Sequence, residues 1–147
     1  MSESDNVTPL RPPEPRKPLF DVRDPKSQTI LVYALTVMAF GINWIGNQFV
    51  AWIGLGLGVA ALAIAASKRD EGPFWARSHF EFALRTIIIA AVAWTIVSII
   101  GVIPILGWII AWLVKPIVMI WVVVRAAVGF LRASETKVID NPVTWLI

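Results

Sequence analysis

The sequence predicts an all-α integral membrane protein with four transmembrane helices arranged as two hairpins. Two long stretches, residues 27–67 and 86–114, contain no Asp, Glu, Lys or Arg. A membrane-spanning helix needs about 20 apolar residues, so the first stretch accommodates two helices and the second accommodates one and the start of another. Hydrophobic residues make up 57% of the 147 residues, more than the small core of a soluble chain of this length can bury.

Residues 1–26 are rich in proline and carry charges of both signs. With few large apolar side chains, this segment gains too little from burial to offset the entropy cost of folding. We expect a disordered N-terminal tail with polyproline II character. A simple spacer beside the membrane is the favoured role, and docking of its regularly spaced prolines into an aromatic groove of a partner is the alternative.

The first hairpin is expected to consist of spans at residues 27–43 and 48–67, joined by a turn at residues 41–48. Glycines and asparagines in this turn favour a tight helix connection. In the second span, Gly54 with Gly58 and Ala61 with Ala65 are four residues apart, a spacing that lets membrane helices approach closely. We therefore expect these four small residues to pack against a neighbouring helix.

Residues 68–85 form a polar stretch that separates the two apolar halves. Ser78 and Glu81 have the spacing of a capping box, which predicts that the third helix begins near His79 and spans residues 82–103. Glu81 and Arg85 are four residues apart, in the order that favours an ion pair on a helix. The stretch thus supplies both the loop between the hairpins and the start of the third helix.

The second hairpin is expected to turn at residues 101–107, which contain Pro104 and no charge. The fourth span then covers residues 107–131 and completes a membrane domain over residues 27–132. Residues 133–147 are expected to leave the membrane as a C-terminal tail. Its last three residues, Trp145, Leu146 and Ile147, would return to the interface as an anchor.

Basic residues gather in three segments next to the predicted spans. They precede the first span, separate the second from the third, and end or follow the fourth: Arg16, Lys17, Arg23, Lys26, Lys68, Arg69, Arg77, Arg125, Arg132 and Lys137. The predicted turns at residues 41–48 and 101–107 have none. By the positive-inside rule, both termini and the central loop are cytoplasmic, which predicts a multi-pass protein of the bacterial cytoplasmic (inner) membrane.

Lys115 is the charged residue that this topology does not explain. An ionisable group within a span costs about 2.5–3.5 kcal/mol on insertion scales and suggests a functional site. Trp108, Trp112 and Lys115 share one helical face, along which the lysine can extend to the interface. Because Pro116 disfavours helix at the preceding residue, residues 105–114 could instead lie as an interfacial segment. Lys115 could also line a polar pathway or contact another subunit.

The sequence offers no constellation that indicates catalysis, a cofactor or a metal. There is no cysteine, and the single histidine, His79, has Phe82 and Ala83 at the helical positions where a second ligand would lie. We therefore expect no enzyme activity, no cofactor and no nucleic-acid binding. The candidate functional residues are the polar groups nearest the membrane: Lys115, His79, Glu81 and Arg85.

Two short stretches carry a resemblance to a known family. The first lies around the start of the third helix and consists of Pro73, Phe74, His79, Ala83, Leu84 and Arg85. The second is the polar stretch at residues 132–142. This pattern is similar to that of a family of small four-span bacterial inner-membrane proteins, distantly related to the chloroplast inner-envelope import component. The resemblance implies the four-helix membrane fold and no activity. The chain departs from the family pattern in having Arg85 where an amide is common and in carrying Lys115.

Two functional hypotheses follow from the sequence. The first is a non-enzymatic accessory, assembly or interaction subunit that binds the lipid bilayer and a membrane-protein partner, or a second copy of itself. The second is a subunit of a small oligomeric transporter or channel with Lys115 in the pathway. Because polar groups within the spans are scarce, the first hypothesis is favoured.

Overall fold

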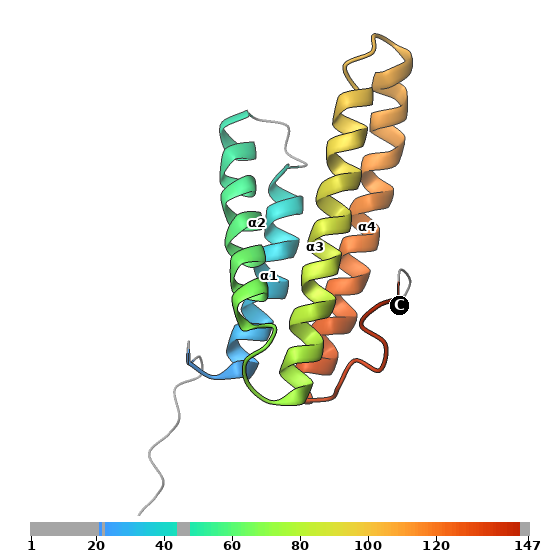
Figure 1. Cartoon of the computed structure of the whole chain (residues 1–147). Helices are drawn as coiled ribbons and strands as arrows, with labels where there is room; N and C mark the ends of the chain where they lie inside the picture. The colour runs from blue at the N-terminus through green and yellow to red at the C-terminus, as the bar shows by residue number, and fades with distance from the viewer. Residues whose placement is uncertain (1–20, 22, 44–47, 145–147) are drawn as a thin grey trace, which may run out of the picture.

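The structure, a computed structural model, describes residues 21, 23–43 and 48–144. These residues form four α-helices and no strand, which confirms the predicted all-α fold. The helices are α1 (Pro25–Asn43), α2 (Gln48–Lys68), α3 (Phe74–Ile100) and α4 (Leu106–Ser134). Helices α1 and α2 form one hairpin and α3 and α4 form the other, and the two hairpins lie side by side (Figure 1).

Three of the four helices are long and apolar enough to cross a membrane, namely α2, α3 and α4. Helix α1 is different because it begins with Pro25 and Lys26 and ends at Asn43. Its apolar part, residues 29–42, covers only about 21 Å at a rise of 1.5 Å per residue. The α3–α4 hairpin therefore extends beyond the α1–α2 hairpin at one end of the molecule (Figure 1).

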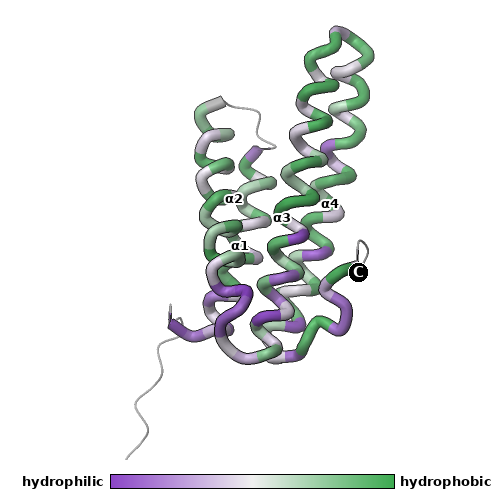
Figure 2. The backbone as a smooth tube through the Cα atoms, viewed as in Figure 1, coloured by the Kyte–Doolittle hydropathy of each residue, from purple (hydrophilic) through white to green (hydrophobic). Residues whose placement is uncertain are grey.

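The two ends of the bundle differ in polarity. Hydrophilic residues gather where α2 joins α3 and where α4 ends, and the opposite end of α3 and α4 is almost entirely hydrophobic (Figure 2). We call the first the charged end. The second, residues 97–112, we call the apolar tip. Large apolar side chains in the tip are widely exposed, for example Val102 at 81% and Ile105 at 78%.

Small residues of α2 lie against α1. A Cβ atom at Gly54 would come within 2.8 Å of the carbonyl oxygen of Ala39, and one at Gly58 would lie 3.6 Å from the Ala39 Cβ. Ala61 and Ala65 are fully buried. The α1–α2 hairpin is thus closed by contacts that larger side chains at these positions would prevent.

Helix α3 begins at Phe74, so the prediction of a start near His79 is wrong. Pro73 precedes the first turn with a φ angle of −67°, and its carbonyl accepts hydrogen bonds from the N–H groups of Ala76 and Arg77. Because its fixed φ angle suits a helix start, proline sets the boundary a turn earlier than the Ser78 position does. The capping box with Glu81 is not formed: the Ser78 hydroxyl instead donates to the carbonyl of Trp75 at 2.7 Å.

Helix α4 continues without a break through Lys115 and Pro116. The alternative in which residues 105–114 form a separate interfacial segment is therefore wrong. A proline within a helix removes one N–H donor, and neighbouring helices in a membrane protein commonly compensate for this loss. Lys115 consequently projects from a regular helix, nine residues after its first residue, Leu106.

The chain reverses direction after α4, and the described part of the predicted C-terminal tail folds back onto the bundle. Thr136 has a left-handed φ angle of 53°, and the N–H of Lys137 donates to the carbonyl of Arg132 at 2.9 Å. This is the geometry of a Schellman turn, in which glycine is the usual residue. Residues 137–144, which we call the strap, then run back beside α4 (Figure 1).

Three predictions fall outside the described residues. They are the disorder of the predicted tail over most of residues 1–26, namely 1–20 and 22, the centre of the first turn at residues 44–47, and the anchor at residues 145–147.

Candidate functional site

Arg125 lies in the interior of the bundle and is fully buried. It is nine residues, or about 14 Å, before the end of α4. Its Nε donates to the Thr86 hydroxyl at 2.9 Å, and its Nη1 donates to the carbonyl oxygen of Thr144 in the strap at 2.8 Å. The guanidinium also lies over the Phe82 ring, 3.9 Å from its centroid. Arg125 therefore joins α3, α4 and the strap.

His79 forms a second buried link between α1, α3 and the strap. Its Nε2 lies 2.8 Å from the carbonyl oxygen of Lys137, and its Nδ1 lies 3.1 Å from the hydroxyl oxygen of Tyr33. Because a carbonyl only accepts hydrogen bonds, Nε2 must carry the proton, and Nδ1 then accepts the Tyr33 proton. Both ring nitrogens of His79 are thus used to hold the fold together.

Tyr33 requires a glycine on the facing helix. A Cβ atom at Gly129 of α4 would lie 2.5 Å from both Cε1 and the hydroxyl oxygen of Tyr33. Only a residue without a side chain lets α4 come close enough for the Tyr33 ring to lie between the helices. Gly129 thereby allows Tyr33 to reach His79.

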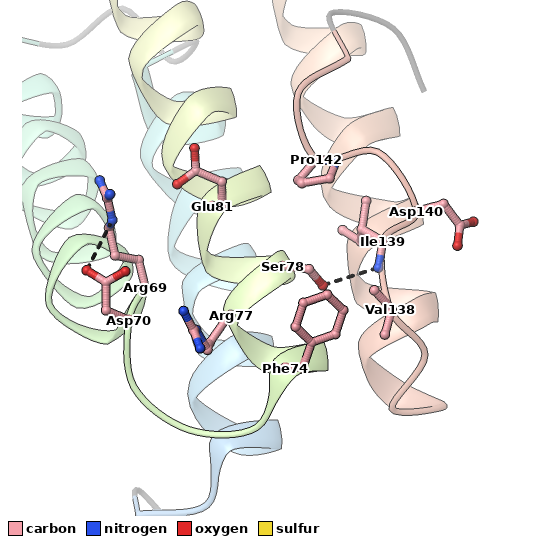
Figure 3. Close-up of a pocket in the computed structure, with 10 residues that line it drawn as sticks. All are labelled: Arg69, Asp70, Phe74, Arg77, Ser78, Glu81, Val138, Ile139, Asp140 and Pro142. Atoms are coloured by element: carbon pink, nitrogen blue, oxygen red, sulfur yellow. Dashed lines mark hydrogen bonds and ion pairs between the residues drawn. The ribbon is translucent and has the colours of Figure 1, made fainter.

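Two further contacts fix the strap on the outer side of α3 and α4. The N–H of Ile139 donates to the Ser78 hydroxyl at 3.2 Å, as Figure 3 shows, and the Ile139 side chain is buried. Arg132 forms an ion pair with Asp140 at 3.1 Å. At the turn before the strap, a hydrogen bond from the Lys137 ammonium at 2.6 Å holds the pKa of the exposed Glu135 carboxyl below its usual value.

A recess of about 530 Å³ opens at the charged end between the strap, the start of α3 and the α2–α3 connection (Figure 3). Ten residues line it: Arg69, Asp70, Phe74, Arg77, Ser78, Glu81, Val138, Ile139, Asp140 and Pro142. The lining combines an apolar part with charges of both signs. Phe74 is 74% exposed, although it is a large aromatic side chain. The strap provides one whole wall, so the recess exists only while the strap is docked.

The structure separates the predicted functional residues into two groups. Glu81 and Arg85 form the expected ion pair, with Oε1 and Nε 2.7 Å apart, and Glu81 lines the recess. His79 is not among the lining residues of the recess and is buried, with its Nε2 next to the Lys137 carbonyl. Lys115 lies towards the other end, where its Nζ is 5.3 Å from the centroid of the Trp94 ring. The described residues contain no group of His, Cys, Asp or Glu arranged to hold a metal.

The burial of Arg125 was not predicted from the sequence, in which this residue served only as a marker of the cytoplasmic side. A signal was present, because Arg125 lies between three valines and two alanines within the predicted span. The partner residues, Tyr33 and Thr86, carried no comparable signal. Tyr33 is a weakly polar residue in an apolar run, and Thr86 is the first residue of one, as is common in membrane helices.

Comparisons with known proteins gave no relatives. Neither the protein-family models, nor the curated proteins, nor the solved structures contained a match to this chain.

Proposed function

We propose that this chain is a non-enzymatic accessory or assembly subunit of the bacterial cytoplasmic membrane that binds a segment of another membrane protein in the recess at its charged end. The observation that carries the proposal is the recess itself, with an exposed Phe74 and an exposed Arg77 on its rim. Its volume of about 530 Å³ is within the range of ordinary ligand-binding clefts.

The lining of the recess suits a protein segment. An exposed aromatic residue and an arginine are the residue types that most often anchor protein interfaces. Phe74, Val138 and Pro142 offer apolar contact, and Arg69, Asp70 and Asp140 lie around them. Such a mixed surface fits an extended or helical peptide with both apolar and charged side chains.

The buried polar groups support a scaffold role. Arg125 and His79 make contacts within the chain that hold the strap, and the strap in turn forms the recess. A binding surface fixed in this way loses little conformational entropy when a partner binds. The alternative of a conduit has less support because Lys115 faces the aromatic ring of Trp94.

The proposed topology has four spans, with α1 as the fourth, and both termini in the cytoplasm. It rests on the concentration of charge at one end of the bundle and the apolar character of the other (Figure 2). Because the chain has no cysteine, single cysteines can be introduced without removing native ones. In intact cells, a cysteine at Arg69 should resist a membrane-impermeant maleimide, and it should react once the cells are opened.

Site-specific photo-cross-linking tests the proposed function. A photoreactive phenylalanine analogue is placed at Phe74 and, as a control, at Ile120, which is exposed on the apolar surface of α4. We expect a discrete protein adduct from position 74 that is absent from position 120. The substitution Arg77→Glu should reduce that adduct, and Arg23→Glu, outside the recess, should not. Lipid adducts alone from position 74, or an adduct insensitive to Arg77→Glu, would contradict the proposal.

A further inference from the structure

One face of α4 is covered by α1 over only part of its length. Near the charged end, Gly129 lies against Tyr33, and Val122 packs in a buried cluster with Phe40. One turn further along, the Met119 Cε lies 3.5 Å from the position of a Cβ atom on Gly41. Helix α1 then ends at Asn43, so the face of α4 beyond Met119 extends past α1.

The continuation of this face, which α1 does not cover, carries Lys115, Trp112 and Trp108. These positions follow Met119 at intervals of four, three and four residues, so they lie on the same side of the helix. The indoles of Trp108 and Trp112 are each 70% exposed. Lys115 is half-buried, with its ammonium over the Trp94 ring. The α3–α4 hairpin thus presents two tryptophans and a cation above the end of α1.

The described residues place no acidic side chain near this cation. The sequence has no Asp or Glu between Asp24 and Asp70, or between Glu81 and Glu135. The acidic residues that the structure describes therefore belong to the charged end and its connections, or to the segment before α1. Within the part of the chain that the structure describes, no acidic residue is placed to meet Lys115.

We propose that Lys115, flanked by Trp112 and Trp108, binds the phosphate of a phospholipid from the leaflet at the apolar tip. Phosphate is the anion that every bilayer offers at this end, and tryptophan prefers the depth of the headgroups. The proposal is independent of partner binding in the recess, because the two sites lie towards opposite ends of the bundle.

The short α1 helix explains how a phosphate reaches Lys115. Lys115 lies about 14 Å below the start of α4, which would place it within the hydrocarbon of an undisturbed bilayer. The apolar part of α1 is about 21 Å long, against a hydrocarbon thickness of roughly 30 Å, and a short helix thins the bilayer around it. Lys115 lies on the side of α4 where this thinning is expected, and its flexible stem shortens the remaining distance.

Native mass spectrometry of the full-length protein in a maltoside detergent tests the proposal. The probes are dioleoylphosphatidylglycerol and dioleoylglycerol, which share their acyl chains and differ in the phosphoglycerol headgroup. We expect Lys115→Gln to weaken phosphatidylglycerol binding about fivefold and Lys115→Arg to retain it. Lys137→Gln, which removes an exposed lysine of the strap, should leave binding at this site unchanged, and dioleoylglycerol should not distinguish the variants.

Two results would overturn the proposal. The first is equal phosphatidylglycerol binding by the wild-type protein and Lys115→Gln. The second is a lipid-independent dimer or a protein complex that Lys115→Gln dissociates, because the occupant of the face would then be a carboxylate of a second copy or of another protein. Removal of a charge from a span favours insertion, so a folding failure of Lys115→Gln is not expected.

Discussion

Arg125 and Lys115 both lie in α4, but their surroundings are of opposite kinds. Arg125 is fully buried, its Nε and Nη1 donate hydrogen bonds within the chain, and aromatic rings lie on its guanidinium. Lys115, about 15 Å further along the same helix, meets one aromatic ring and an uncovered face. The difference follows from what covers α4. Helix α1 and the strap lie over α4 near Arg125, and neither lies over it near Lys115. A cation within a span therefore acts as a structural link or as a ligand site, according to its neighbours.

Arg125→Ala should have the largest effect on stability. It removes two charge-assisted hydrogen bonds and the stacking on Phe82, and it leaves the Thr144 carbonyl without this donor. We expect a loss of about 3 kcal/mol, measured by thermal unfolding in detergent. Lys115→Ala is the matched control on the same helix and should change stability little. Equal losses of stability in the two variants would show that Arg125 and Lys115 do not differ in their contribution to the fold.

Gly129→Ala should come next, because the added methyl group overlaps the Tyr33 ring. We expect a loss of about 2 kcal/mol from overpacking. Gly56→Ala is the control, since a Cβ atom there meets nothing within 4 Å and alanine favours the helix. Unfolding temperatures that rise for Gly56→Ala and fall for Gly129→Ala would support the contact. A neutral Gly129→Ala would show that α4 does not lie this close to Tyr33.

Tyr33→Phe should have a smaller effect, because it removes only the hydroxyl that donates to His79 Nδ1. The buried nitrogen then loses this donor, at a cost of about 1 kcal/mol. Combining Tyr33→Phe with His79→Phe should cost less than the sum of the two single changes. Strict additivity in this double-mutant cycle would mean that the two side chains do not interact.

Thr136→Gly should have the smallest effect and the opposite sign. Thr136 holds a φ angle of 53°, which glycine adopts without steric strain. We expect a gain of about 0.5 kcal/mol in stability, detected as a small rise in unfolding temperature. Thr136→Val keeps the bulk of the side chain and should lower the unfolding temperature instead. A gain with both substitutions would point to a cause other than the backbone angle.

Sequence patterns led to the helices because long charge-free stretches mark them. The charge-free stretches at residues 27–67 and 86–114 locate most of α1, α2 and α3 and the first part of α4. The start of α3 was misplaced because two competing signals, Pro73 and the Ser78–Glu81 pair, lie five residues apart. Both are valid helix starts locally, and the geometry of the turn before Phe74 decides between them.

The strap and its buried partners could not be predicted in the same way. The contacts of residues 137–144 with Ser78, His79 and Arg125 join segments far apart in the sequence. They depend on backbone carbonyls and N–H groups, which nearly any residue provides, so they leave no pattern of residue types. The positive-inside rule indicates on which side of the membrane a basic residue lies. It does not indicate how deep in the membrane or how buried that residue is. This is why Arg125 was grouped with the exposed basic residues.

Cysteine accessibility in membranes tests whether Arg125 holds the strap in place as a wall of the recess. Single cysteines are placed at Phe74, which is 74% exposed, and at Ile139, which is 6% exposed. In opened membranes, Phe74→Cys should react rapidly with a maleimide and Ile139→Cys slowly. The added substitution Arg125→Ala should make Ile139→Cys reactive. If Ile139→Cys reacts as fast as Phe74→Cys while Arg125 is present, the strap is not docked on the bundle and Arg125 does not hold it there.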